Sequence, residues 1–320
     1  MKGLWLRSLW LVLAGVAFFG AVGLILSWAP DIPVQELKLR WARPPSRFID
    51  VNGQQVHLRD EGPAGDPVPI ILVHGTGASL HTWQGWAEGL REQRRVIRFD
   101  LPGFGLTGPN RQHDYSIARY VLFVRSVADQ LGIDRFVLAG NSLGGEIAWV
   151  TAATLPERVD RLILVDPAGY APEALGIAQE VPLGFRLARM PVARTLARYV
   201  LPRGVVERSL RELYGEPEQV TPERVDLYLD MTRRAGNRDA LGRRFEQGNS
   251  GVDLRLLKQV QAPTLILWGG DDRLLPPELG ERMAREIPHA RLIVLQGLGH
   301  VPQEEDPPRT LAAVRRFLAS

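Results

Sequence analysis

The feature that most constrains this chain is a glycine-rich turn at residues 140–145 (GNSLGG), between an apolar run that ends at Ala139 and a helix-like run that begins at Glu146. Two of its glycines flank Ser142 in a G-x-S-x-G pattern. A side chain at either flanking position would collide with the backbone of a sharp strand-to-helix bend. The pattern predicts a nucleophile elbow, in which Ser142 projects alone above a β-sheet.

The chain around this turn alternates between strand-like and helix-like runs. Two short runs joined by Asn52 and Gly53 match a hairpin with a type I′ turn, because both residues accept a positive φ. Later runs are continuously apolar, as in central strands that are covered on both faces. The alternation predicts an α/β fold with a mostly parallel sheet and helices on both faces. The expected strands cover residues 48–51, 55–59, 69–73, 96–99, 136–139, 161–165, 264–268 and 291–295.

The segment 171–249 breaks the alternation, because it holds helix-like pieces that prolines and glycines separate, with no convincing strand. We interpret it as a helical cap inserted after the sixth strand, which leaves 48–170 and 250–320 as the core. The segment carries many arginines between apolar residues. We predict that these arginines lie on a surface exposed to water. The alternative is a surface that contacts a membrane or binds an anionic substrate.

An uncharged, apolar run covers residues 8–30. At about 1.5 Å per residue, a helix of this length spans a bilayer core, and tryptophans stand near both ends. We therefore predict that residues 1–30 form a transmembrane helix that anchors the protein in membrane lipid. A cleaved signal peptide is the alternative, with an imperfect cleavage site at 27–29. Residues 31–47 contain prolines and show no clear periodicity, and are expected to be an irregular linker.

Composition excludes several classes of function. The chain has no cysteine, which rules out disulfides and thiol catalysis, and its net charge of +3 is too small to favour nucleic acid as a partner. Basic residues flank both ends of the apolar run, so charge does not fix the orientation in the membrane. We expect the folded domain on the extracytoplasmic side, because long domains translocate largely regardless of nearby charge. The sequence does not indicate an oligomeric state.

Five motifs, in order, resemble those of the α/β-hydrolase fold family, in its capped, serine-nucleophile branch that includes esterases and lipases. The resemblance extends from about residue 48 to the C-terminus and implies the α/β-hydrolase fold. It includes an oxyanion loop, a D-x-P-G-x-G loop, the nucleophile elbow, an acid loop and a histidine loop. These motifs are 74–77 (HGTG), 100–105 (DLPGFG), 140–145 (GNSLGG), 268–273 (WGGDDR) and 299–302 (GHVP).

Chemistry at Ser142 needs two partners. A serine hydroxyl is a poor nucleophile until a base takes its proton, and His300, after the last expected strand, is the candidate base. The base needs a carboxylate that fixes its tautomer. Asp271 and Asp272 compete for this role, and the resemblance selects Asp272 because the family's acid directly precedes Arg-x-x-Pro. Some relatives carry the acid after the sixth strand, where Asp166 stands; otherwise Asp166 braces the turn that follows it.

The resemblance also implies an oxyanion hole made by the backbone N–H groups of Thr76 and Leu143. Each such donor lowers a reaction barrier by roughly 2.7–4 kcal/mol. Leu143 would open a helix, whose partial positive charge favours an anion. His74 is expected to support the loop, and Asp100 with its loop is expected to be structural. The sequence shows no metal-binding cluster and no phosphate- or dinucleotide-binding motif, so we expect neither a metal nor a cofactor.

These residues predict a membrane-anchored serine hydrolase that cleaves carboxylic esters through an acyl-enzyme on Ser142. Apolar esters, with medium-length acyl chains, are the expected substrates. Two alternatives remain open. The elbow also resembles that of the carbon–carbon bond hydrolases of aromatic-ring breakdown, although those carry a tryptophan after the histidine where this chain has Val301. The other alternative is a hydrolase-like scaffold that only binds a ligand or a partner.

Overall fold

The computed structural model describes residues 10, 11, 13–15, 18, 23, 27–171, 176–190, 199–248 and 252–319. The predicted membrane helix at 8–30 falls largely outside these residues. Within them, none of the helices combines the length and the apolar character that a bilayer-spanning segment needs.

In the described part of the chain the strands form one eight-stranded sheet, with the order β1-β2-β4-β3-β5-β6-β7-β8. The β1–β2 and β2–β4 pairs are antiparallel, and the other neighbours are parallel. The expected α/β fold with a mostly parallel sheet is therefore confirmed. The strands are β1 (Arg47–Val51), β2 (Gln54–Glu61), β3 (Ile70–Val73), β4 (Val96–Phe99), β5 (Phe136–Asn141), β6 (Val159–Val165), β7 (Thr264–Gly269) and β8 (Ala290–Leu295).

The hairpin at the start of the sheet has the predicted turn. Asn52 and Gly53 adopt φ values of 54° and 82°, which is the left-handed region that a type I′ turn requires. The turn sets the register, in which Val51 pairs with Gln54. The second hairpin strand then joins β4, so the antiparallel pair extends one edge of the parallel sheet.

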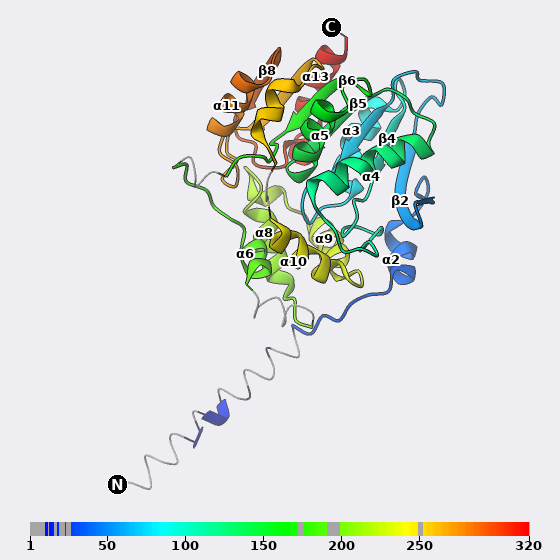
Figure 1. Ribbon diagram of the computed structural model, residues 1–320. Coiled ribbons are helices and arrows are strands. Elements are labelled where there is room, and N and C mark those ends of the chain that lie inside the picture. The colour runs from blue at the N-terminus through cyan, green and yellow to red at the C-terminus, as the bar shows by residue number, and fades with distance from the viewer. Residues whose placement is uncertain are drawn as a thin grey trace.

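Helices cover both faces of the sheet (Figure 1). On one face lie α4 (Ile117–Gln130), α5 (Leu143–Thr154) and α11 (Glu278–Glu286), and on the other lie α3 (Gln84–Leu90) and α13 (Pro307–Leu318). Buried residues of β3 alternate between the two cores, because successive side chains of a strand point to opposite faces. Short helical turns complete the core: η1 (Leu80–Trp83), η4 (Leu254–Gln259) and α12 (Pro302–Glu305).

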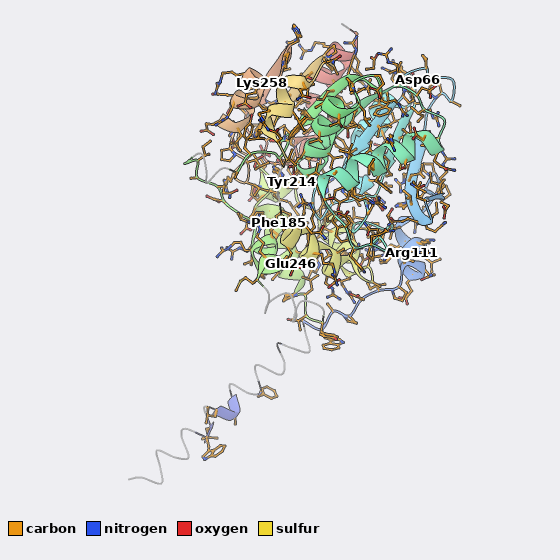
Figure 2. The ribbon with its side chains drawn as sticks, in the orientation of Figure 1. Asp66, Arg111, Phe185, Tyr214, Glu246 and Lys258 are labelled. Carbon is orange, nitrogen blue, oxygen red and sulfur yellow. The ribbon has the colours of Figure 1, made fainter. Side chains whose placement is uncertain are left out.

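In the described part of the segment between β6 and η4, the regular elements are helices joined by loops. Its elements are α6 (Leu183–Arg189), α8 (Arg203–Arg211), η3 (Pro217–Gln219), α9 (Pro222–Arg233) and α10 (Asn237–Gln247), which gather on one side of the sheet (Figure 1). Phe185 and Tyr214 belong to this cap (Figure 2). Several cap arginines form exposed ion pairs, such as Arg208 with Glu212 at 2.7 Å, which favours a solvated face for them.

The expectation of an irregular linker at 31–47 was wrong. This segment contains α2 (Val34–Trp41), which packs on the cap through the buried Leu37, next to Met231 of α9. The Trp41 indole donates to the Asp230 carboxylate at 2.8 Å. The apolar residues at positions 34, 37 and 41 recur at helical spacing. One or two turns are too short for this spacing to predict a helix clearly, and a helix of this length depends on its contacts with the cap.

Residues just before α2 also attach to the cap. Trp28 forms an isolated β-bridge with Val200, and Ala29 N–H donates to the Tyr199 carbonyl at 2.8 Å. The described end of the apolar N-terminal run is therefore bound to the cap and does not extend away from it as a tether.

A buried glutamate lies where the cap meets the elbow helix. Glu146 of α5 is 1% exposed, and its carboxylate is 4.0 Å from Arg244 of α10. Neither carboxylate oxygen has a hydrogen-bond partner among the described residues. Burial raises the pKa of Glu146 to about 7, and the charge of Arg244 offsets only part of this rise.

Because the pKa of Glu146 is higher in the folded protein than in the unfolded chain, the folded protein holds one more proton between about pH 4.5 and pH 7. This proton favours folding, and its contribution to the free energy of unfolding, up to about 3 kcal/mol, is lost as the pH rises through this range. We predict that Glu146→Gln flattens this part of the pH dependence of the free energy of unfolding, measured by urea titration. The exposed Glu157→Gln is the control. Parallel curves for wild type and Glu146→Gln would contradict the prediction.

Candidate active site

The strand-to-helix turn at Ser142 has the predicted sharp geometry. Ser142 adopts φ 55° and ψ −118° between β5 and α5, and its side chain is half-buried. A Cβ on Gly140 would lie 2.0 Å from the carbonyl oxygen of Gly144, and a Cβ on Gly144 would lie 2.2 Å from that of Val73. No larger residue fits at these positions, so the two glycines are what allow β5, α5 and β3 to approach each other.

His300 meets one of the two candidate carboxylates. Its Nδ1 lies 2.6 Å from Oδ2 of Asp272, and both side chains are buried. Oδ1 of Asp272 accepts hydrogen bonds from the N–H groups of Leu274 and Leu275, each at 2.9 Å. Asp271 instead accepts a long hydrogen bond from Gly297. The structure therefore pairs His300 with Asp272, the carboxylate that the sequence motif selected.

Asn141 joins the elbow to the histidine loop. Its side-chain amide donates to the carbonyl oxygens of His300, at 3.0 Å, and Val165, at 3.1 Å. Because Asp272 occupies Nδ1 of His300, Nε2 is the ring nitrogen left to take a proton from Ser142. In the sequence, Asn141 is recognisable only as part of the elbow motif, so its bond to the histidine loop was not predicted. The one available signal was a polar side chain next to the nucleophile in a buried strand.

The predicted oxyanion loop passes beside the nucleophile, since a Cβ on Gly75 would lie 3.0 Å from that of Ser142. Burial lowers the pKa of His74 behind the loop, which keeps its ring neutral. Its Nε2 accepts from Leu101 N–H at 2.9 Å, so the proton is on Nδ1 and is donated to the Gly75 carbonyl at 2.8 Å. In a trans peptide the next N–H, that of Thr76, points the opposite way.

Leu143 is the first residue of α5, where N–H groups have no acceptor within the helix. Leu143 directly follows Ser142 in the chain, and Thr76 directly follows Gly75, which lies beside Ser142. Their role as oxyanion donors remains a prediction.

Asp100 has the structural surroundings that we expected. It accepts hydrogen bonds from the N–H groups of Leu80 and Leu106 and from Nδ1 of His57, all at 2.7 Å. Nε2 of His57 lies 2.9 Å from the hydroxyl of Ser46, so these three side chains form a second Ser-His-Asp chain. They line neither of the cavities described below, and we assign them a structural role.

An apolar cavity of about 320 Å³ lies between the oxyanion loop and the cap. Thr76 of the predicted oxyanion loop is part of its wall, and so is Leu213, whose carbonyl accepts the His300 N–H at 2.7 Å. Arg238 is the single charged residue among the described residues that line it, and it is paired with Asp31. Most of the rest are apolar, including Phe185, Leu187, Val200, Leu201, Pro202, Val205, Val206, Leu210 and Leu241.

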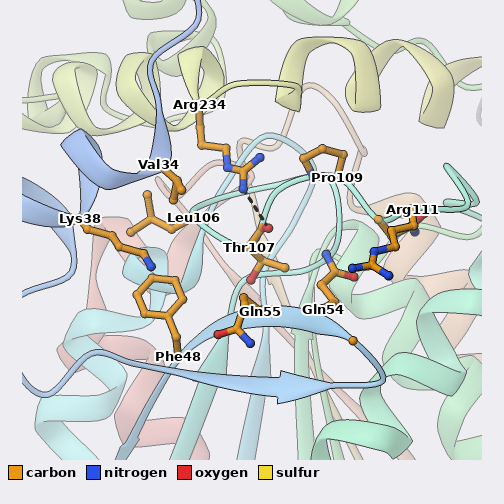
Figure 3. A pocket seen from close by; sticks show the side chains of 12 residues that line it. Val34, Lys38, Phe48, Gln54, Gln55, Leu106, Thr107, Pro109, Arg111 and Arg234 are labelled. Carbon is orange, nitrogen blue, oxygen red and sulfur yellow. Dashed lines mark hydrogen bonds between the residues drawn. The ribbon is translucent and has the colours of Figure 1, made fainter.

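A different cavity, of about 220 Å³, lies beside the β1–β2 hairpin and α2 (Figure 3). Its wall includes the basic side chains of Lys38, Arg111 and Arg234, and Arg234 donates to the Thr107 carbonyl. Its described lining includes no residue of the predicted oxyanion loop, whereas the lining of the apolar cavity includes Thr76 and Gly77. The apolar cavity is therefore the candidate substrate pocket.

Asp166, Asp272 and His300 are also residue types that bind metals, and their candidate ligand atoms lie within 4.8 Å of one another. Two ligands on one tetrahedral zinc ion are about 3.3 Å apart, given bonds of about 2.0 Å. The 2.6 Å between His300 and Asp272 is shorter than this separation and is that of a charge-assisted hydrogen bond. The pair therefore has the geometry of a histidine–carboxylate hydrogen bond and not that of two ligands on one zinc ion.

Comparison with known proteins agrees with the fold and the motifs. A family profile described as the alpha/beta hydrolase fold matches residues 68–307, so the chain belongs to this family. An uncharacterised protein of Mycobacterium tuberculosis is 32% identical over 291 residues, which cover 87% of this chain and 82% of the relative. The 2-hydroxy-6-oxo-2,4-heptadienoate hydrolase of Pseudomonas putida is 30% identical, covering 86% of this chain and 96% of the relative.

Among solved structures, the chain is similar to a membrane phospholipase A described as a bacterial virulence factor. The two are 28% identical with a TM-score of 0.71, and the match covers 100% of this chain and 98% of the other. The chain is thus a hydrolase of the alpha/beta hydrolase fold, with relatives that act in different reactions.

We predict that Ser142→Ala abolishes hydrolysis and leaves the fold intact, because the turn accepts a small side chain and only the nucleophile is lost. Turnover of p-nitrophenyl butyrate and the circular dichroism spectrum would be measured together. A folded variant that retains turnover would rule out Ser142 as the nucleophile.

We predict that Asp272→Asn lowers kcat by about 10⁴, the scale that follows from loss of the correct histidine tautomer. Asp271→Asn is the matched control, since the neighbouring carboxylate has no contact with His300. It should cost far less, and so should Asp166→Asn. If the larger loss occurs at Asp166, the acid of the triad stands after β6.

Proposed function

We propose that this protein is a serine hydrolase that cleaves carboxylic esters with an apolar acyl chain. The apolar cavity between the predicted oxyanion loop and the cap carries the proposal. His300 takes the proton from Ser142 as its oxygen attacks the ester carbonyl, and Asp272 stabilises the imidazolium that forms. His300 then returns the proton to the leaving alcohol. In the second half of the reaction, a water activated by His300 attacks the acyl-enzyme, and Ser142 is regenerated.

The cavity suits an acyl chain and not a charged group. Each methylene group that leaves water for its apolar wall contributes about 0.8 kcal/mol, and part of this binding energy appears in kcat/KM. Phe185 and Leu187 come from the apolar cap segment 183–187, and Val200 and Leu201 come from the apolar cap segment 196–201. Residues 196–198 of the latter lie outside the described residues. The similarity to a membrane phospholipase A also favours a lipid-like ester.

We further propose that the apolar run at 8–30 anchors the protein in a bilayer, with the catalytic domain on the extracytoplasmic side. Residues 27–29 attach to the cap at Tyr199, Val200 and Leu201, and the last two of these line the cavity. Such an anchor would keep the cavity near lipid. Trp28 and Tyr199 stack with ring centroids 5.7 Å apart and are more than half exposed, which suits the headgroup region.

A second candidate function is carbon–carbon bond hydrolysis, which the similarity to 2-hydroxy-6-oxo-2,4-heptadienoate hydrolase supports. Two observations favour ester cleavage instead. Val301 stands where the carbon–carbon bond hydrolases carry a tryptophan, and here it packs with cap residues such as Leu210 and Tyr214. In addition, Arg238 is the single charged residue among the described residues that line the cavity, and it is already paired with Asp31, which disfavours an anionic substrate. Turnover of 2-hydroxy-6-oxo-2,4-heptadienoate at a rate above that of every ester would reverse this choice.

We predict that kcat/KM toward p-nitrophenyl esters rises from acetyl to a maximum at a medium chain length, because added methylene groups are buried in the cavity. The full-length protein in detergent micelles would be assayed with acetyl, butyryl, hexanoyl, octanoyl and dodecanoyl esters. A maximum at acetyl that falls steadily with length would refute the apolar-pocket assignment. No labelling of Ser142 by a fluorophosphonate probe would instead indicate a binding scaffold.

We predict that Val205→Phe moves the preferred acyl length downward, because the larger ring fills part of the cavity that Val205 lines. Hydrolysis of the octanoyl ester should fall about tenfold or more relative to the acetyl ester, which corresponds to two lost methylene contacts. Leu122→Phe is the control, since Leu122 is exposed on α4 and does not line this cavity. An unchanged length profile in Val205→Phe would place the acyl chain elsewhere.

A further inference from the structure

Two buried carboxyl groups lie together beneath His300. Asp166 stands after β6 and is fully buried, and Asp272 follows β7 and is 3% exposed. Their oxygens and a ring nitrogen of His300 lie within 4.8 Å of one another. Two carboxylates this close, away from water, do not both ionise, because each charge opposes the other and neither is solvated. One of the two must hold a proton.

The hydrogen bonds identify which one. Asp272 accepts from two backbone N–H groups and faces Nδ1 of His300, all of which stabilise an ionised carboxylate. Asp166 accepts from a single backbone donor, Gly269 N–H, at 2.8 Å. Its other oxygen, Oδ2, has no N–H or hydroxyl partner among the described residues although it is buried. A proton on Asp166 would make this carboxyl group a hydrogen-bond donor within 4.8 Å of a carboxylate oxygen of Asp272.

The surroundings of Asp166 agree with this assignment. Burial and, after it, the nearby charge of Asp272 raise the pKa of Asp166 well above its usual range. The backbone of Asp166 also has a φ of 43°, a conformation that few residues with side chains adopt. The fold therefore holds this carboxyl group in one place beside the triad.

We propose that Asp166 is a positioning residue: a neutral carboxylic acid that donates a hydrogen bond to Asp272 and so orients that carboxylate toward His300. The proposal rests on the proposed function, in which His300 is the base. The proton stays on Asp166 throughout the reaction, and no bond to it forms or breaks. Its hydrogen bond also draws electron density from Asp272, which keeps the shared proton on Nδ1 of His300.

A neutral hydrogen-bond donor at Asp166 and an ionised carboxylate at Asp166 predict different effects of substituting this residue. Asp166→Asn keeps both contacts, because the amide oxygen still accepts from Gly269 and the amide N–H₂ donates to Asp272. Asp166→Ala removes the donor, which leaves Asp272 free to attract an imidazolium more strongly. Loss of the donor should then shift the acidic limb of the kcat/KM profile to higher pH, because this limb reports protonation of the base in the free enzyme.

One other titratable group faces Asp166 and must be controlled. Glu305 of α12 accepts hydrogen bonds from the N–H groups of Gly215 and Gly299, and burial raises its pKa to about 7. Its titration falls in the same pH range as the acidic limb. The comparison between the two Asp166 variants should therefore be repeated in the Glu305→Gln background, where the difference between them should persist.

The experiment measures kcat and kcat/KM against pH for the full-length protein and both variants, with p-nitrophenyl butyrate. We expect Asp166→Asn to remain within about threefold of wild type with an unmoved acidic limb. Asp166→Ala should lose about tenfold in kcat, the scale of one hydrogen bond to a charged group, with the limb about 0.5 to 1 pH unit higher. A limb more than one unit lower in Asp166→Asn would show that Asp166 carries a negative charge. If Asp166→Asn and Asp166→Ala have the same kcat and the same acidic limb of kcat/KM, Asp166 only fills space.

An infrared measurement tests the protonation state without relying on activity or on the folding of Asp166→Ala. The difference spectrum of wild type minus Asp166→Asn at pH 7 should contain the carbonyl stretch of a protonated carboxylic acid. A pair of carboxylate bands in its place would overturn the proposal. This outcome is distinct from failure of the proposed function, which loss of the Ser142 requirement for turnover would show.

Discussion

The close approach of three backbone segments at the elbow is the constraint on which the rest of the site depends. Gly144 lies against the end of β3, and a Cβ on Gly145 would lie 2.6 Å from the ring of Pro167, just after β6. This packing is possible only because these positions lack side chains. It brings the loops that follow β3, β5 and β6 to one point at the carboxyl ends of the strands, with Ser142 between them. The oxyanion loop and Asp166 are placed by the same contact.

The cap is tied directly to the catalytic histidine loop. The N–H of His300 donates to Leu213 of the cap, and Glu305 bridges Gly299 of the loop to Gly215 of the cap. Next to it, Glu304 accepts hydrogen bonds from the hydroxyl groups of Tyr214 and Tyr228. A displacement of the cap would therefore disturb the backbone that carries His300. The apolar cavity and the candidate base are linked, because Leu213 lines the cavity and its carbonyl accepts the His300 N–H.

The sequence was informative where local chemistry decides the structure. Glycines that flank Ser142, the Asn52–Gly53 turn and continuous apolar runs predicted the elbow, the hairpin and the parallel strands, because backbone sterics and burial act over a few residues. Asp272 was chosen correctly as the partner of His300, although only through a family motif. Composition and spacing alone left Asp271 and Asp166 open, since all three carboxylates stand at strand ends.

Contacts between distant residues were the part that sequence reasoning missed. The α2 helix was taken for a linker because its stability comes from Leu37 and Trp41 packing on α9, some 190 residues away in the chain. Asn141 binds the His300 carbonyl across 159 residues, and no local pattern marks such a pair. The function of a polar side chain of this kind depends on its partner, so it becomes visible only once the fold is known.

The charges around the site point to a neutral substrate. Asp272 is balanced by the histidine that it orients, Asp166 adds no second charge under our proposal, and Arg238 is paired with Asp31 at the edge of the cavity. An ionised substrate would find no charged partner among the described lining residues that is not already engaged, and burying it without one would cost several kcal/mol. A neutral ester brings charge into the site only as the oxyanion forms, next to the N–H groups of Thr76 and Leu143 if these are the donors that we predict. The electrostatics and the apolar wall therefore favour the same class of substrate.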